Sequence, residues 1–205
     1  MKYYLQYLWV AAAVAAWGGV PAQANTITGE IWENFTTTTL GDEQGTFANV
    51  ATLSGARSAD VTFSLTGPIN FSSVVGGYTI GGFLGSGGAT IVTGSGQAGN
   101  NLDNTLFYFS GMLSMVHGET YDLSHDDGAE LSINGSDVVN SSIATDSFYT
   151  WTGASGNYNF QLAYAEVEGP PGILTMHSVP DGGSTMAMLG GVLTVMGGVA
   201  RRIRK

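Results

Sequence analysis

Short runs of β-favouring residues recur along the middle of this chain, separated by turn-forming residues at intervals of roughly ten positions. Residues 61–65 alternate apolar and polar side chains with a period of two, and residues 160–164 do so again. No amphipathic helix pattern interrupts the series. This spacing predicts an all-β, antiparallel sandwich or barrel rather than alternating strands and helices. The other expected strands are residues 78–80, 89–92, 106–109, 130–133, 137–139 and 172–176.

Two segments need a separate interpretation. Asn134 and Gly135 stand between two of the expected strands, and this dipeptide is the strongest short signal for a β-hairpin. Residues 76–99 are dense in glycine but also contain several large apolar side chains. We expect this stretch to form two short strands joined by tight turns, rather than a flexible linker.

The N-terminal residues resemble a secretory signal in their physical character. Lys2 precedes an apolar run at 8–16, a helix-breaking segment follows, and Ala22 and Ala24 supply the small residues that signal peptidase accepts. The sequence predicts a signal peptide over 1–24, with cleavage after Ala24. A retained N-terminal anchor is the alternative, but the run is short for a membrane span.

The other end of the chain predicts a membrane helix. Residues 186–200 are apolar and would make a helix of about 22 Å, so neighbouring residues must extend the span to 184–200. A basic tail at 201–205 follows, and its charges would stay on the cytoplasmic side. A buried globular helix is the alternative. The basic residues of the tail are Arg201, Arg202, Arg204 and Lys205.

Charge is distributed very unevenly once both ends are set aside. Residues 25–180 contain fifteen acidic residues and one basic residue, Arg57, which gives a net charge of −14 against −10 for the whole chain. Nucleic acid is excluded as a partner because phosphate binding needs a Lys/Arg surface. Divalent cations or neutral glycans suit such a surface better, and solubility outside the cell is the alternative explanation. The chain has no cysteine, so it has neither disulfides nor thiolate chemistry.

Asp126 and Asp127 form the most distinctive site candidate. Two adjacent carboxylates at a strand end, followed by Gly128, offer hard oxygen ligands for Ca²⁺. Asp122 and Glu130 are near enough in sequence to add charge. The spacing differs from an EF-hand loop, and a simple Asp-Gly turn is the alternative.

Catalytic signatures are missing from the sequence. The three histidines are far apart and lack a zinc pattern, and no nucleophile elbow is present, so we expect no enzyme activity. Three aromatic residues, Tyr149, Trp151 and Tyr158, are candidates to stack on sugar rings, with core packing as the alternative role.

The segment 125–135, followed by Val138-Val139-Asn140, resembles the signature hairpin of PA14-like domains. Residues 156–166 resemble their closing turn and strand, residues 173–175 match the last apolar strand, and residues 27–34 are similar to the opening one. The resemblance implies a PA14-like β-sandwich over 25–178 that binds carbohydrate. It also implies that Asp126 and Asp127 hold a calcium ion which coordinates sugar hydroxyls.

The last 27 or so residues resemble a PEP-CTERM sorting signal in the variant that begins Val-Pro-Asp. A motif, an apolar helix and a basic cluster follow one another in that order over 179–205. The resemblance implies recognition by an exosortase in a Gram-negative bacterium that makes extracellular polysaccharide. The motif residues are Val179, Pro180, Asp181, Gly182 and Gly183.

These observations together predict an exported, non-enzymatic protein of the cell surface or exopolysaccharide matrix. The protein is expected to pass through an inner-membrane intermediate before it arrives there. Its expected partners are signal peptidase, exosortase, and extracellular polysaccharide or surface glycans. Ca²⁺ is the only expected cofactor. A purely structural surface protein without a specific ligand is the alternative.

Overall fold

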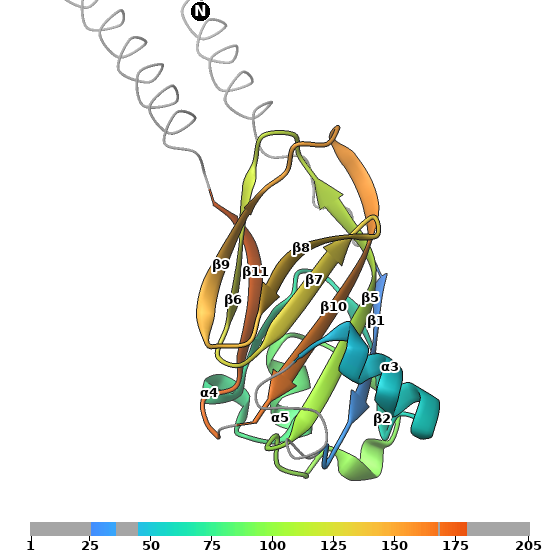
Figure 1. The fold of residues 1–205 in the computed structure, drawn as a ribbon. Coiled ribbons are helices and arrows are strands. Elements are labelled where there is room, and N and C mark those ends of the chain that lie inside the picture. The colour runs from blue at the N-terminus through green and yellow to red at the C-terminus, as the bar shows by residue number, and fades with distance from the viewer. Residues whose placement is uncertain (1–25, 36–44, 168, 180–205) are drawn as a thin grey trace, which may run out of the picture.

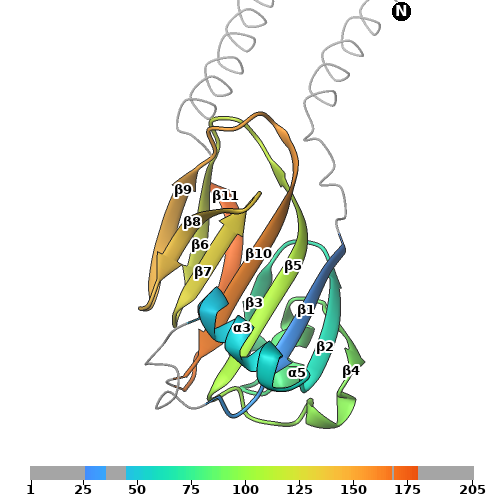
Figure 2. The same ribbon diagram turned by 45° about the vertical axis from the view of Figure 1, so that its right-hand side comes forward.

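The computed structural model describes residues 26–35, 45–167 and 169–179, and in these residues two antiparallel β-sheets pack face to face (Figures 1 and 2). The predicted antiparallel β-sandwich is therefore confirmed, and short helices that were not expected accompany its strands. The expected signal peptide and most of the sorting segment lie outside the described residues. Within the described part, no helix is long and apolar enough to cross a membrane.

The larger sheet has seven strands in the order β4-β2-β1-β5-β10-β7-β8. Its long central pair, β5 and β10, is antiparallel along its whole length, from Thr105 opposite Glu166 to Met115 opposite Gly156. The bounds are β1 Thr26–Trp32, β2 Val61–Thr66, β4 Thr90–Thr93, β5 Thr105–Met115, β7 Ala129–Ile133, β8 Ser136–Ser141 and β10 Gly156–Glu166.

The smaller sheet has four strands in the order β3-β11-β6-β9. Its strands are β3 Asn70–Ser72, β6 Thr120–His125, β9 Thr145–Thr150 and β11 Ile173–Val179. The expected strands did not include β3 or β9, and β6 was implied only by the strand end expected before Asp126. The last strand runs to Val179, which pairs with Thr120, so the first residue of the expected sorting motif is part of the sandwich.

Aromatic side chains fill the space between the sheets. Phe63 on β2 packs edge-on against Phe109 on β5, with 5.3 Å between their ring centroids. Its ring lies directly over Gly29 of β1, where a Cβ atom would come within 2.0 Å of the Phe63 ring. Phe71 of the smaller sheet reaches the same cluster, 5.6 Å from Phe109. This core joins the two sheets.

The predicted Asn134–Gly135 hairpin is confirmed. Asn134 and Gly135 both have positive φ, 53° and 79°, which is the left-handed pair that a type I′ turn requires. The turn connects β7 to β8, which pair antiparallel.

The strand predicted at residues 78–80 is wrong, because residues 80–86 form helix α5 (Ile80–Ser86). Thr79 caps it by accepting a hydrogen bond from Gly82 N to Oγ1 over 3.1 Å. Ile80, Phe83 and Leu84 share one helix face and are buried, so the apolar residues taken for strand residues form a helical stripe. Shorter helical turns lie on either side, α4 at Ser73–Gly76 and η1 at Ser95–Gln97.

Helix α3 (Phe47–Ala56) was not predicted either. Thr46 caps it, and Phe47 N donates to Glu130 Oε2 on β7 over 2.6 Å. The carboxylate thereby meets the positive end of the helix dipole. The helix lies on the outer face of the larger sheet, where Val50 joins a small apolar cluster (Figure 2). The sheet residues of this cluster are Trp32, Leu106, Ala163 and Ala165.

Candidate functional site

Asp126 and Asp127 lie where the chain crosses from one sheet to the other. They follow β6 of the smaller sheet and precede β7 of the larger one. The turn also contacts the end of β10, because Ala165 N donates to Gly128 O over 3.0 Å. The predicted turn after a strand is confirmed, and it is a junction between the two layers rather than a surface hairpin.

Both carboxylates accept hydrogen bonds from backbone N–H groups of neighbouring segments. Asp126 Oδ1 accepts hydrogen bonds from Ile173 N on β11 over 2.9 Å and from the Tyr164 hydroxyl over 2.5 Å. Asp127 Oδ2 accepts a hydrogen bond from Val167 N over 2.6 Å, and Asp127 is only 4% exposed. The paired aspartates therefore fasten the start of β11 and the end of β10 to the turn.

A chain of short contacts leads inward from Asp126. The Tyr164 hydroxyl contacts both Asp126 Oδ1 and Glu166 Oε2. The Tyr78 hydroxyl lies 2.8 Å from Glu166 Oε1 and 2.7 Å from Asp103 Oδ1. Each hydroxyl carries one hydrogen and so donates to only one of its two carboxyl neighbours. The other oxygen–oxygen contact of each hydroxyl is favourable only when a carboxyl group in this cluster is protonated and supplies the second hydrogen.

Glu166 is the group best placed to hold that proton. It is fully buried, and burial together with the nearby Asp126 raises its pKa to about 8, although hydrogen bonds from the two tyrosines oppose this shift. Burial also raises the pKa of Asp126. Burial and the adjacent carboxylates raise the pKa of Tyr78, so this hydroxyl stays protonated. The cluster is therefore a proton-sharing carboxyl–tyrosine network.

The geometry of the turn bears on the calcium prediction. Ca²⁺ takes six to eight oxygen ligands. One oxygen of each aspartate already accepts hydrogen bonds, and among the described residues no group of three or more His, Asp or Glu side chains is arranged to hold a metal ion. Glu130, expected to add charge, contacts α3 instead, and Asp122 faces His177 at 3.6 Å. Calcium at Asp126 and Asp127 stays a prediction.

His125 has a structural environment. Its Nδ1 lies 2.5 Å from the carbonyl oxygen of Asp127, so Nδ1 carries the hydrogen, and Nε2 accepts from the Ser147 hydroxyl over 3.2 Å. Burial lowers the pKa of this histidine. The neutral ring thus links the turn to β9.

The three aromatic candidates form one cluster at the other end of the sandwich. Trp151 is 8% exposed and packs against Tyr158, with 4.6 Å between ring centroids, and against Tyr149 at 6.2 Å. The Trp151 indole and the Tyr158 hydroxyl both donate to Ala154 O, which fixes the loop after β9. Trp151 therefore has a packing role. Sugar stacking by the two half-buried tyrosines stays a prediction.

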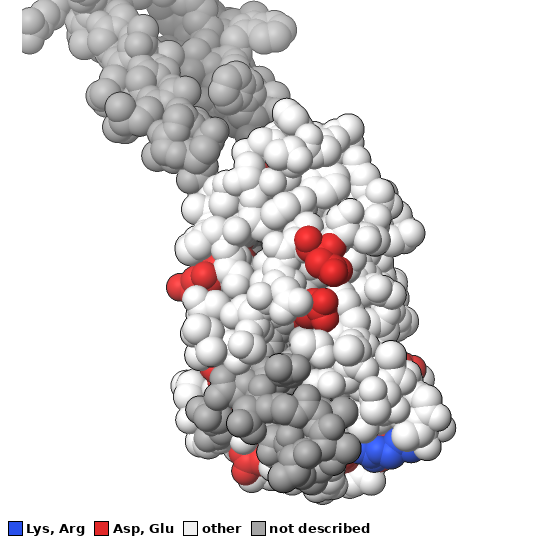
Figure 3. All heavy atoms as spheres, viewed as in Figure 1, with Lys and Arg blue, Asp and Glu red and all other residues white. Residues whose placement is uncertain are grey.

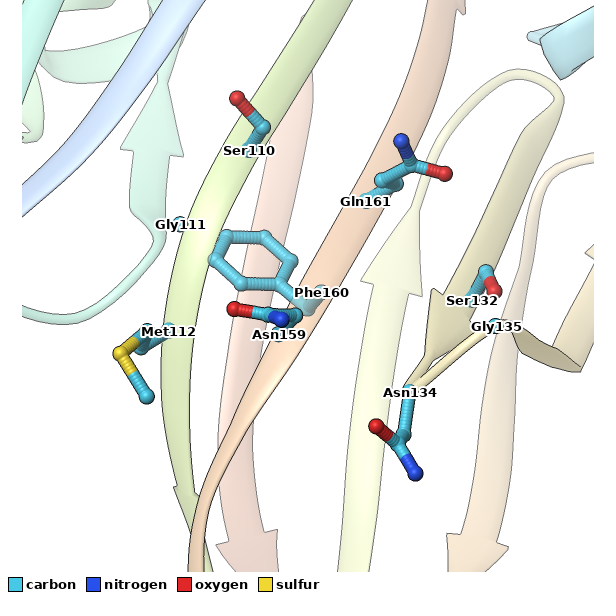
Figure 4. Close-up of a pocket in the computed structure, with 9 residues that line it drawn as sticks. All are labelled: Ser110, Gly111, Met112, Ser132, Asn134, Gly135, Asn159, Phe160 and Gln161. Atoms are coloured by element: carbon cyan, nitrogen blue, oxygen red, sulfur yellow. The ribbon is translucent and has the colours of Figure 1, made fainter.

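A groove of about 500 Å³ on the outer face of the larger sheet was not predicted (Figure 4). It lies over β5, β10 and the β7–β8 hairpin, beyond the part of the sheet that α3 covers. No charged side chain lines it. Its lining consists of Ser110, Gly111, Met112, Ser132, Asn134, Gly135, Asn159, Phe160 and Gln161.

Figure 3 shows that the face carrying α3 is largely uncharged, with scattered acidic groups. Arg57 is the only lysine or arginine among the described residues, and its guanidinium already binds two groups of the protein. It lies 2.7 Å from Asp60 Oδ2 and also donates to Glu33 O. The described surface therefore offers no free cation to an anionic ligand.

Comparison with known proteins gives no matching family model and no matching curated protein. Among solved structures, the PA14 domain of the MpAFP antifreeze protein matches with a TM-score of 0.55 and 22% identity, over 77% of this chain and 83% of that one. The fold is PA14-like. The PA14 sugar-binding domain of an RTX adhesin gives a TM-score of 0.54 and 21% identity, over 76% and 90% of the two chains. The PA14-like fold expected from residues 125–135 and 156–166 is confirmed.

Proposed function

We propose that this chain is an exported, non-enzymatic protein of the cell surface or exopolysaccharide matrix, and that its PA14-like sandwich binds glycan. The observation that carries the proposal is the groove on the larger sheet. Its polar side chains are amides and hydroxyls, which both donate and accept hydrogen bonds, as sugar hydroxyls do. The similarity to a domain named as sugar-binding supports the same ligand class.

The charge of the surroundings narrows this class to neutral glycans. An acidic glycan or a nucleic acid would meet a surface with one paired arginine and many carboxylates, and the repulsion would oppose binding. A neutral glycan meets no such cost. The apolar side chain of Met112, 42% exposed at the edge of the groove, offers contact to the C–H surface of a sugar ring.

A purely structural surface protein is the second candidate. The observation that favours it is that the turn at Asp126 and Asp127 serves as a junction within the fold, so its residues need no ligand to explain them. The two candidates differ in one measurable property, because only the first predicts saturable binding of a defined glycan.

A glycan array probed with the full chain in detergent tests the proposal. We expect binding to neutral glycans and none to uronic-acid or sulfated ones. The Asp126→Asn, Asp127→Asn variant distinguishes binding through Ca²⁺ from binding by the groove alone. If Ca²⁺ takes part, EDTA and this variant each abolish binding; if the groove acts alone, neither does. Folding of the variant is checked by circular dichroism, and no binding to any neutral glycan would contradict the proposal.

The sorting segment 179–205 completes the proposal, with exosortase and signal peptidase as partners during export and the membrane as a transient anchor. Deleting residues 180–205 leaves β11 intact to Val179 and is expected to release the protein into the medium. The measurement is immunoblotting of membrane and medium fractions. A Pro180→Ala, Asp181→Ala variant should instead accumulate in the membrane unprocessed. Unchanged membrane retention of the deleted form would rule out this role of the segment.

A further inference from the structure

Polar side chains cross the whole outer face of the larger sheet at one level. The strand pairs place Thr28 opposite both Ser64 and Ser110, Ser110 opposite Gln161, and Gln161 opposite Ser132. Directly opposed residues point to the same face of a sheet. The complete row, from β4 to β8, is Thr90, Ser64, Thr28, Ser110, Gln161, Ser132 and Asp137.

The row continues beyond the groove without a break. Ser110, Gln161 and Ser132 line the groove, and Thr28 Oγ1 lies 3.2 Å from Ser110 Oγ just outside it. Seven strands spaced about 4.8 Å apart give the row a length of roughly 29 Å. The groove covers the row only on β5, β10 and β7, toward the β8 edge of the sheet, so the hydrogen-bonding surface is considerably longer than one or two sugar units need.

Helix α3 sets one border of this surface. On the same sheet face, Leu106 and Ala163 lie under the helix, whereas Ser110 and Gln161, further along the same strands, lie outside it. Side chains change from apolar to polar along each strand, so the part of the sheet face that α3 leaves uncovered suits contact with solvent or with a polar ligand. From Thr90 to Ser132 the row is an unbroken series of hydroxyl and amide groups, and it ends at the carboxylate of Asp137. Such a row matches a repeating polyol better than a protein surface with its mixed charges.

We propose that the domain binds its glycan as an extended neutral polysaccharide chain, laid across the strands along this row. This inference rests on the proposed glycan binding and adds the form of the ligand: an internal stretch of a long chain rather than a terminal sugar. Groove residues on β5, β10 and β7 hold one part of this chain, and Thr28 and Ser64 hold the units that lie further toward β4. The Asp137 carboxylate at the far end disfavours an acidic chain.

The test compares chain lengths. Calorimetry with the full chain in detergent uses matched disaccharides and heptasaccharides of neutral glucan, galactan and mannan. For the sugar that binds, we expect the heptasaccharide to bind at least tenfold more tightly than the disaccharide. The Thr28→Ala, Ser64→Ala variant should lose this advantage while keeping its affinity for the disaccharide. The matched control, Asn70→Ala, Ser178→Ala on the smaller sheet, should leave both affinities unchanged.

The outcomes separate the two proposals. Equal affinity for short and long chains, or a Thr28→Ala, Ser64→Ala variant that keeps the full advantage of the long chain, would overturn the extended-chain inference while leaving glycan binding in place. No heat of binding with any of the three sugars at either length would overturn both.

Discussion

Replacing Phe83 by alanine is expected to destabilise the domain by about 3–5 kcal/mol, the range seen when a buried phenylalanine is truncated. Phe83 is fully buried and projects from α5 into the core. Its ring stacks on Phe71 of the smaller sheet and packs against Phe107 of the larger one, each at 5.2 Å between centroids. The substitution thus removes a contact shared by the helix and both sheets.

Urea unfolding of the full chain in detergent measures this loss. Val75→Ala on α4 is the control, because Val75 is 84% exposed and its truncation should change the stability by no more than about 0.5 kcal/mol. A loss below about 1 kcal/mol for Phe83→Ala would contradict the packing of α5 between the sheets.

The stability of the domain is expected to fall as the pH rises from about 4.5 to about 8, through the carboxyl group of Glu166. The pKa of this group is about 8 in the fold, against 4.5 for an ordinary glutamate. Between these values the folded chain holds a proton that the unfolded chain has released, so the stabilisation is complete below pH 4.5 and is lost above pH 8. The slope is about 1.4 kcal/mol per pH unit for one proton.

Glu166→Gln tests the origin of this slope, because glutamine keeps the shape and stays neutral at every pH. Urea midpoints at pH 5, 7 and 9 should vary much less in this variant, which should exceed the unsubstituted chain in stability at pH 9. Glu30→Gln, an exposed position on β1, serves as the control and should keep the original slope. An unchanged slope in Glu166→Gln would show that the proton is held elsewhere.

The sequence predicts those parts of the fold that local chemistry determines. The Asn134–Gly135 turn needs only two residues with positive φ, and the alternating strand at 160–164 needs only its own periodicity. Helix α3 depends on a partner distant in sequence, since Glu130 anchors its start across 83 positions. Helix α5 was not predicted because its glycines favour turns when only the local sequence is considered. Gly82 is needed there for a tertiary reason, since a Cβ atom at this position would lie 2.1 Å from Gly76 O.

The site was only partly predictable for the same reason. Adjacent carboxylates at 126–127 marked the turn, but their hydrogen bonds go to Val167 and Ile173, some 40 and 47 positions away. The groove escaped prediction because its side chains come from three strands and a hairpin that only the sheet register brings together. The serine, asparagine and glutamine residues of the groove give no signal in the sequence until that register is known.

The affinity of the groove for a neutral oligosaccharide is the most direct test of the central claim. Asn159 and Gln161 are exposed on the outer face of β10 and line the groove, so their replacement by alanine leaves the core intact. We expect the Asn159→Ala, Gln161→Ala variant to bind at least tenfold more weakly than the unsubstituted chain, with an unchanged urea midpoint. Equal dissociation constants for the two proteins would contradict glycan binding at this site.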